Sequence, residues 1–489
     1  MSSPAVELTE RDGKIGVLPP SEGALPVYVG AATAGPLTPG TFSTVPDLLA
    51  TYTEGAKLPG SMICAAAHAI AQGKGPVVII RTGATNPGED GTLDDEDFGG
   101  TSVPTLDATN EPVDDIDLVI KWIKGGAVET TGMTYRVSFD NGVSFGALRE
   151  LGVATSLVVP EIGDGWAIDL AAGTILTGAI LRVRTTAPIW AAGEMTTALT
   201  SLRNWVGSWD LVYPVGDMTA TGFDAIETAI AGMRAVGKEK TWFGCFRRPL
   251  VGETSAEYKT AFDAALGAKS TTSGAISAGV NSYVSAVNGS EFARPAMHVI
   301  FARESGLSEE GNAAEIGLGP LPGRITDSNG NPWHHDESVA PGLDDSRAYV
   351  LKSDEDEPGV FVNRPRLFST ETSDFQLVPH RRVMNRAKRV LRAYLKKRLN
   401  KPIRVNKKTG FITETDRKEI EMGANRALAD ALLAKPKASN AYFVLSKTDN
   451  VLATKTLTGA CYVVPLAYPE LINVDPVSFL NPALQTIAA

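Results

Sequence analysis

Two apolar stretches decide the fold of this chain, Pro26-Val-Tyr-Val-Gly30 and Pro76-Val-Val-Ile-Ile-Arg81, with the Ala-rich segment 61–72 between them. Each stretch is short, nearly unbroken and bounded by Gly or Pro, which is typical of a strand buried on both faces. Parallel strands need a long crossover, usually a helix. The order strand, helix, strand therefore predicts a parallel pair under a helical cover.

The same alternation returns after residue 190. Strands are predicted at 209–215, 241–246 and 296–301, and the segments 223–233 and 255–266 are predicted to be the helices between them. Such a series can extend the first sheet. Residues 21–112 and 191–360 are therefore expected to form one discontinuous α/β core.

Residues 113–190 follow a different pattern and are expected to form an inserted all-β domain that resembles a small sandwich. The segment 133–139 alternates apolar and polar residues, Asp140-Asn141-Gly142 is a type I′ hairpin signal, and 143–145 would continue as the partner strand. Further alternating runs complete the β pattern near 156–159, 166–170 and 179–185.

Residues 361–476 are expected to form a carboxyl-terminal α+β assembly domain. It would contain helices at 381–399 and 416–433 and strands at 441–445 and 460–466. The first helix keeps one apolar stripe, made of Val383, Ala387, Val390, Leu391, Tyr394 and Leu395. The whole chain is thus predicted to be a multidomain protein of mixed α+β and α/β class.

Both ends of the chain resemble extended arms that have no partner strand nearby. The first arm, 1–20, contains Val6 and Leu8, and the second arm, 477–489, contains Val477, Phe479 and Leu480. A lone strand is stable only when it pairs elsewhere, for example with a sheet edge of another copy. Disorder of both termini is the alternative. Exchange that does not close on itself would give a helical polymer.

Charge is strongly polarised along the chain, whose net charge is −10. Residues 89–117 carry acids without a Lys or Arg, whereas 381–408 carry thirteen basic residues without an acid. These cations repel one another unless something negative faces them, so we expect the basic helix to bind an acidic surface of a protein. Nucleic acid is the alternative partner, but no aromatic stacking platform accompanies the basic run, and we do not expect it.

No catalytic residue, metal site or cofactor is predicted, and the chain is not expected to be an enzyme. Gly142-Val-Ser144-Phe-Gly146 matches a hydrolase elbow but follows a hairpin signal and lacks the strand–turn–helix context. His334-His335-Asp336 lacks further ligands, and Gly73-Lys74-Gly75 lacks the rest of a phosphate loop. No segment has the apolar length of a membrane span, and direct membrane insertion is not expected.

Several stretches, in order and spacing, resemble the contractile tail sheath proteins of Mu-like and related myophages or phage-tail-like particles. In the amino-terminal part they are Pro26-Val-Tyr-Val-Gly30, Ala34-Gly35-Pro36 and Val77-Val-Ile-Ile-Arg81. In the carboxyl part they are Asn363-Arg-Pro-Arg366, Arg381-Arg-Val-Met384, Gly410-Phe-Ile-Thr413, Asn450-Val-Leu452, Pro465-Leu-Ala-Tyr468 and Phe479-Leu-Asn-Pro482.

The resemblance implies a sheath-type α/β core and a structural role. Subunits would polymerise helically around a tail tube, exchange their arms, and contract to drive the tube through a host envelope. Implied partners are the chain itself, the tail tube protein, and baseplate and tail terminator proteins. The implied location is the contractile tail of a virion, after assembly in the host cytoplasm. The tube-facing residues would be Arg381, Arg382, Arg386, Lys388, Arg389, Arg392, Lys396 and Lys397.

Three other classes of function stay open at this point. A tail-tube or capsid subunit would form short rings or shells. A nucleic-acid-binding protein would bind DNA through the basic helix in a salt-dependent manner. A secreted hydrolase would need a catalytic set that the chain does not offer.

Overall fold

The computed structural model describes residues 25–32, 34–52, 61–83, 86–107, 109–325, 342–353 and 356–469. The chain divides into two compact units, Met1–Pro402 and Ile403–Ala489. The predicted arms, 1–20 and 477–489, lie outside the described residues, and so does His334-His335-Asp336. The class is mixed, with helices and several separate sheets, as the sequence predicts.

A six-stranded sheet forms the centre of the first unit. Its strands are β1 (Leu25–Ala31), β2 (Gly40–Phe42), β3 (Val77–Thr82), β13 (Trp209–Pro214), β14 (Thr241–Cys245) and β15 (Gly274–Ser277). They lie in the order β15-β14-β13-β1-β3-β2, and only β2 runs antiparallel to its neighbour. Val27 pairs with Val78, and both are fully buried. The predicted parallel pair is confirmed.

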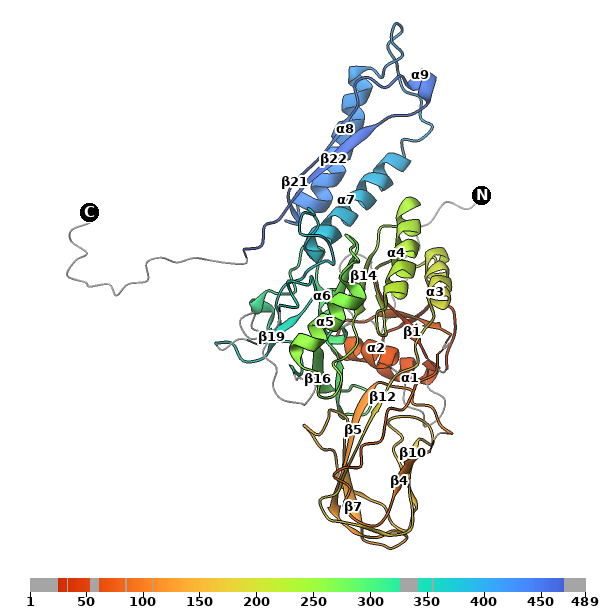
Figure 1. Ribbon diagram of the computed structural model, residues 1–489. Helices are drawn as coiled ribbons and strands as arrows, with labels where there is room; N and C mark the ends of the chain where they lie inside the picture. The colour runs from red at the N-terminus through yellow and green to blue at the C-terminus, as the bar shows by residue number, and fades with distance from the viewer. Residues whose placement is uncertain are drawn as a thin grey trace, which may run out of the picture. The chain divides into compact units, whose positions relative to one another are not determined.

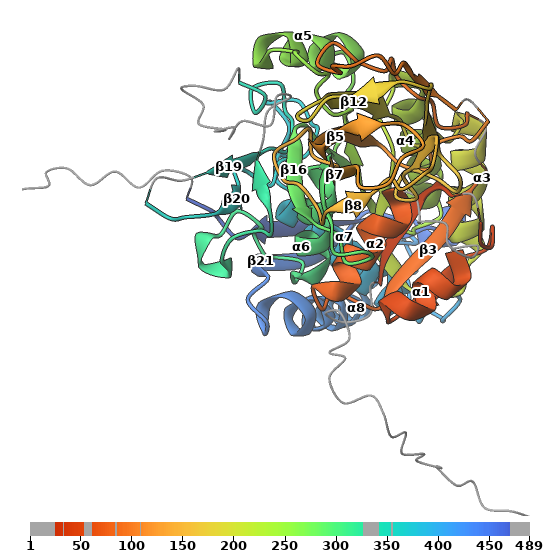
Figure 2. The same ribbon diagram turned by 90° about the horizontal axis from the view of Figure 1, so that it is seen from below.

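Helices cover both faces of this sheet, and they are α1 (Val45–Tyr52), α2 (Ser61–Ala71), α3 (Ala192–Asn204), α4 (Ala220–Ala235), α5 (Ser255–Leu266) and α6 (Met297–Gly306). The steps β1–α2–β3 and β13–α4–β14 run in opposite directions along the sheet. Right-handed crossovers therefore place α2 and α4 on opposite faces. Helix α3 packs on α4, and α6 packs on α2. Figure 2 shows α2 and α3 on either side of β3.

The strand predicted at 296–301 is wrong, because these residues belong to α6. Every residue from Met297 to Ala302 is buried, so this part of the helix has no side exposed to solvent and its sequence shows no helical period. A short apolar run without periodicity does not distinguish a buried helix from a buried strand. The strand that completes the series is β15, which pairs in parallel with β14 and whose sequence, Gly-Ala-Ile-Ser, carries one large apolar residue.

Residues 104–185 form the β-rich segment at the opposite end of the first unit from α7 (Figure 1). One sheet has the order β12-β5-β7-β8, from Ile180–Thr185, Ile116–Lys124, Thr134–Ser138 and Arg149–Glu150. Another has the order β4-β10-β9, from Pro104–Leu106, Ala167–Leu170 and Ser156–Val158, and β6 (Gly126–Ala127) pairs with β11 (Thr174–Ile175). Their side chains share one hydrophobic cluster that includes Trp122 and Trp166, both fully buried.

The partner strand predicted at 143–145 is wrong, because β7 pairs with β8 instead. Asn141 and Gly142 do have positive φ angles, of 60° and 86°. The chain after them stays in a loop because the carboxylate of Asp140 accepts hydrogen bonds from the backbone N–H and the hydroxyl of Ser144, at 2.9 and 2.7 Å.

The rest of the first unit connects this segment to the core. Strands β16 (Val280–Val284), β17 (Glu291–Pro295) and β18 (Arg324–Ile325) form an antiparallel sheet. Phe292 of β17 stacks on Phe139 with 4.9 Å between ring centroids, so it belongs to the hydrophobic cluster of the β-rich segment. The 3₁₀ turn η2 (Ile316–Leu318), strands β19 (Leu351–Ser353) and β20 (Val360–Val362), and helix α7 (Val378–Lys396) follow.

The second unit is a helix packed on a two-stranded sheet. Helix α8 (Glu414–Leu428) continues as a π-helical turn, η3 (Ala429–Leu433), so the predicted helix at 416–433 is confirmed. Strands β21 (Ala438–Leu445) and β22 (Gly459–Pro465) pair antiparallel, with the short helix α9 (Val451–Thr454) between them. The predicted strands at 441–445 and 460–466 are also confirmed.

Candidate functional site

A small cavity lies where ligands usually bind in sheets of this type. Strands β1 and β13 are neighbours whose connections leave in opposite directions, and the cavity is at their carboxyl ends, next to Ala31 and Asp217. Its volume is about 40 Å³, whereas small-molecule sites usually have several hundred. Val113 and Asp115 of the β-rich segment and residues 186–189 directly after it line this cavity.

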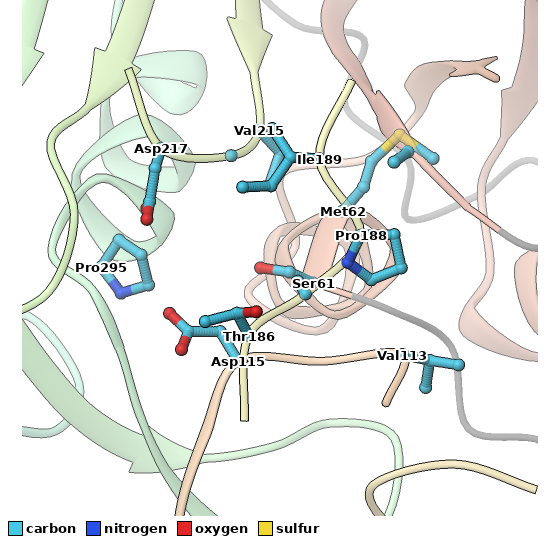
Figure 3. A pocket seen from close by; sticks show the side chains of 13 residues that line it. Ser61, Met62, Val113, Asp115, Thr186, Pro188, Ile189, Val215, Asp217 and Pro295 are labelled. Atoms are coloured by element: carbon cyan, nitrogen blue, oxygen red, sulfur yellow. The ribbon is translucent and has the colours of Figure 1, made fainter. Parts of the chain in front are cut away.

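The carboxylates that line the cavity interact with charged groups of the same chain. Figure 3 shows the side chains of Asp115, Asp217 and Ser61 turned toward the same space. The carboxylate of Asp115 accepts two hydrogen bonds from the guanidinium of Arg248, at 2.8 and 2.5 Å. Burial, reinforced by the negative charge of Asp115, raises the pKa of Asp217 to about 6. The cavity lining offers no histidine, cysteine or lysine for nucleophilic or acid–base chemistry.

Buried ion pairs join the β-rich segment to the core. Arg248, which is 1% exposed, binds Asp115 and Asp117, and Arg294 binds Asp114. Arg184 donates a hydrogen bond to the carbonyl of Pro249 at 2.5 Å. These acids belong to the acidic run at 89–117, so part of that run is neutralised within the chain.

The first turns of α7 are anchored inside the first unit. Arg382 donates to the carboxylate of Glu304 at 3.1 Å, and Glu304 also accepts a hydrogen bond from the hydroxyl of Tyr349 at 2.8 Å. Arg381 is buried beside Phe375, and burial, followed by the nearby charge of Arg234, lowers its pKa. Arg381 and Arg382 are 4% and 8% exposed, so the prediction that they face a partner surface is corrected: both belong to the interior.

The middle of α7 meets acids of the same unit. Lys388 lies 3.6 Å from Glu239, and Arg389 forms ion pairs with Asp210 and Glu309. Burial lowers the pKa of Arg389 to about 10. The negative charge expected opposite the basic helix is therefore supplied in part by acids of this chain itself.

The carboxyl end of α7 presents its cations to solvent. Lys396 and Lys397 are exposed, whereas Arg386 and Arg392 are partly buried. The guanidinium of Arg392 lies over Gly237, where a Cβ would come within 0.6 Å of it. The basic surface available to a partner is thus narrower than predicted from the sequence and centres on Lys396 and Lys397.

The hairpin of β21 and β22 has one open edge in the described part of the second unit. The backbone N–H of Phe443 donates to the amide oxygen of Asn425 at 2.6 Å, and that of Leu445 donates to Glu421 at 2.8 Å. Helix α8 thus covers the outer edge of β21. Cys461 is directly opposite Phe443, so its N–H and C=O point away from β21. No described strand pairs with this edge of β22.

The acidic partners of the basic helix could not be identified from the sequence; they are Asp210, Glu239, Glu304 and Glu309. One signal was visible, since Asp210 interrupts the apolar run Trp209-Asp-Leu-Val-Tyr213 and Glu304 follows the apolar run of α6. A lone acid in a buried element needs a cation. The sequence alone does not say which one.

The described residues contain neither a group of metal ligands nor a helix suited to a membrane. No three His, Cys, Asp or Glu side chains are grouped so that they could hold a metal ion. None of the described helices has the length and apolar character needed to cross a membrane.

The fold is similar to that of solved structures, although the sequence matches no family model. No family model matches the chain, and no curated protein matches it. Among solved structures, a chain in the cryo-EM structure of the anti-feeding prophage helical sheath in its contracted state matches with a TM-score of 0.50 and 12% identity, over 98% of this chain and 100% of that chain. The contracted sheath complex of an extracellular contractile injection system, PVC, matches with a TM-score of 0.50 and 11% identity, over 98% of both chains.

This chain has the fold of a contractile tail sheath protein. A chain of the anti-feeding prophage baseplate structure gives a similar result, with a TM-score of 0.51 and 12% identity over 98% of this chain and 100% of that chain. The sheath resemblance drawn from the order and spacing of short stretches is thus confirmed for the fold. The sheath fold extends over nearly the whole chain and includes the carboxyl part that carries α7 and the hairpin.

Proposed function

We propose that this chain is a structural subunit of a contractile tail sheath and has no enzymatic role. Copies would polymerise helically around a tail tube, and contraction would drive the tube through the host envelope. The observation that carries this proposal is the sheath fold, matched over 98% of the chain by a sheath in its contracted state. The crevice where an enzyme of this topology binds its ligand holds only a cavity of about 40 Å³ lined by the chain's own segments, which agrees with a structural role.

The assembly would use the terminal arms and the open edge of β22. An extended segment adds to an exposed edge through backbone hydrogen bonds. The backbone groups of Cys461 and Val463 on that edge pair with no strand in the part of the chain that the structure describes, and the apolar residues of an arm, such as Val6 and Leu8, would pack beside them. Donation from each subunit to the next would give a helical polymer if the rotation between subunits does not close into a ring.

The tube contact would lie at the carboxyl end of α7. Lys396 and Lys397 are the exposed members of the predicted tube-facing set, and an acidic tube surface would attract them. Baseplate and tail terminator proteins would bind the two ends of the polymer. The particle tail would be its location, after assembly in the host cytoplasm.

The proposed domain organisation follows the predicted boundaries: a core from 21–112 and 191–360, a β insert at 113–190, and an assembly domain at 361–476. Energy for contraction would be stored when the sheath assembles in its extended lattice. Rigid-body rotation of subunits tethered by their arms would release it.

The arms provide the test. Val6→Asp combined with Leu8→Asp should leave a folded, soluble monomer and abolish polymers, because it removes the apolar side chains of the amino-terminal arm. Deletion of residues 477–489 should do the same for the other arm. Negative-stain microscopy and sedimentation velocity of the purified chain measure both effects.

The matched control is Glu7→Ala combined with Thr9→Ala, which replaces the polar residues that alternate with Val6 and Leu8. This variant should polymerise normally. Hollow tubes from the arm variants would contradict arm exchange. Closed shells or short rings from the intact chain would instead indicate a capsid or tube subunit.

A further inference from the structure

A second cavity lies within the first unit, where α2 packs on α6. Its volume is about 220 Å³, whereas the cavity beside Asp217 has about 40 Å³. A water molecule takes up ~30 Å³ in the liquid, so there is room for a small organic molecule. The walls come from α2 and the turn after it, from α6, and from the segment that contains η2 and ends at Pro322. We refer to this space as the α2–α6 cavity.

The charged side chains that line the α2–α6 cavity are basic. Lys74 follows the end of α2, Arg303 belongs to α6, and no Asp or Glu is part of the lining. Neither of these two cations forms an ion pair with an acid in the described part of the chain. A cavity with charges of one sign and low-dielectric walls attracts a small ion of the opposite sign.

Two buried nitrogen atoms of lining residues have no hydrogen-bond partner among the described residues. They are Nε2 of His68, whose side chain is 3% exposed, and Nη1 of Arg303. The other terminal nitrogen of Arg303, Nη2, donates to the carbonyl of Gly319 at 2.6 Å and thereby fixes the guanidinium group. Buried polar atoms are nearly always hydrogen-bonded. Two such atoms on different helices beside one cavity therefore indicate a bound group that takes part in hydrogen bonds.

His68 contributes polarity to the cavity without adding charge. Burial lowers the pKa of His68 to about 4, so its ring is neutral at physiological pH. The ring packs on Tyr283 with 4.4 Å between centroids, which limits its movement. The positive charge of the cavity at neutral pH thus comes from Lys74 and Arg303.

The rest of the lining is mostly apolar. Val299 of α6 and Leu321 are 1% and 5% exposed, and Leu318 of η2 lies on the same wall of the list of lining residues formed by the segment up to Pro322. A bare inorganic anion would leave these side chains without contact. An anion that carries an apolar body would pack against them, as ligands do in sites that combine apolar walls with a few polar groups.

We propose that the α2–α6 cavity binds a small organic carboxylate. Its carboxylate group would be bound by Arg303 and Lys74, since an arginine with a free terminal nitrogen forms charge-assisted hydrogen bonds with carboxylate oxygens. Its apolar body would pack on Val299 and Leu321. The site involves neither the arms nor the hairpin of β21 and β22, so it is independent of the proposed sheath function. The bound molecule would link α2 to α6 and stabilise the first unit.

The test uses para-fluorobenzoate as the probe and the full-length chain, with ligand-observed fluorine NMR. We expect saturable binding with a Kd of about 1 mM or below, which is in the range that so small a ligand can reach. The amide para-fluorobenzamide has nearly the same shape without the charge, and it should bind at least tenfold more weakly.

Two variants locate the site. Arg303→Met removes the fixed cation and should weaken binding of para-fluorobenzoate at least tenfold. Gln72→Glu places a negative charge on an exposed residue of the lining, so it should fold even if Arg303→Met does not, and it should weaken binding about fivefold. The control is Arg136→Met, which makes the same substitution at an exposed residue of β7 and should bind the probe like the wild type.

Four results would overturn the proposal. They are the absence of saturable binding at millimolar probe, equal binding of the amide, wild-type affinity in folded Gln72→Glu, and equal loss in Arg136→Met. Inorganic phosphate is the competitor that tests the apolar body. Phosphate at the concentration of the probe should leave most of the probe bound, and full displacement would overturn the assignment of an organic ligand.

Discussion

Asp217 lies directly after β13, where burial and the neighbouring Asp115 make its negative charge unfavourable. The positive charge of Arg248 opposes this only in part, and its guanidinium hydrogen bonds go to Asp115 and Asp117. The pKa of Asp217 is about 6 in the folded chain, above its usual value near 4. The folded state therefore binds a proton that the unfolded state has lost between about pH 4 and pH 6, and stability falls as the pH rises through this range.

Asp217→Asn removes the ionisable group and should stabilise the chain above pH 6. We expect the free energy of unfolding at pH 7.5 to rise by on the order of 2 kcal/mol, from the roughly two-unit shift in pKa. Thermal melting between pH 4 and pH 8 measures this, and the wild type should lose stability across pH 4–6 more steeply than the variant.

Asp224→Asn is the matched control, because Asp224 lies on exposed surface of α4 and its side chain is 60% exposed. Its pH profile should follow that of the wild type. A profile for Asp217→Asn that also follows the wild type would mean that the carboxyl group of Asp217 is ionised without a penalty.

At the scale of the element, α7 combines a buried start with an exposed end. Glu304 is fully buried, and burial raises its pKa while Arg382 opposes this rise. Removing the cation would leave a buried carboxylate without its ion-pair partner, which typically costs about 3–5 kcal/mol. The ion pair therefore holds the first turns of α7 to α6.

Arg382→Met should lower the melting temperature of the first unit and increase hydrogen exchange across 378–387, measured by mass spectrometry. Lys397→Met, at the exposed end of the same helix, should change stability by less than about 0.5 kcal/mol. Adding Glu304→Gln to Arg382→Met should recover part of the loss. If the double variant is no more stable than Arg382→Met, the cost comes from lost packing and not from the unpaired charge.

Elements with a clear period could be predicted from sequence. The stripe of Ile226, Ile230 and Met233 predicted α4, and the short apolar, β-branched and aromatic run at 441–445 predicted β21. Residues 296–301 could not be assigned correctly, because α6 is buried on all sides and shows no period. The burial of Arg381 and Arg382 was not visible either, since a helix rich in Arg reads as solvent-exposed until its acidic partners, distant in sequence, are known.

At the scale of the whole molecule, the cations available for the proposed tube contact are the exposed Lys396 and Lys397 at the end of α7. Lys396→Glu combined with Lys397→Glu should weaken co-sedimentation with the tail tube of the same particle at least tenfold at low salt. The wild-type interaction should also weaken as salt increases, because exposed charges are screened.

Lys407→Glu combined with Lys408→Glu reverses two exposed charges that are not on α7 and is the control. Equal loss in both double variants would indicate a general effect of net charge. The order of the segments was enough to indicate the sheath fold, whereas the partner surfaces depend on which cations are left after internal pairing, and only the folded chain determines that.

Phe292 stacks on Phe139, and Arg248 and Arg294 form ion pairs with Asp115 and Asp114. The β-rich segment therefore cannot be deleted without exposing buried groups of the rest of the first unit. A subunit shortened by splicing residue 112 to residue 191 would bring two guanidinium groups and an aromatic ring, each normally covered, into contact with water. Any replacement module grafted there must bring carboxylates for both arginines and an apolar socket for the ring. Engineers who wish to vary this part of the subunit should therefore keep 113–117 and 139–140 and change the loops farther from the graft.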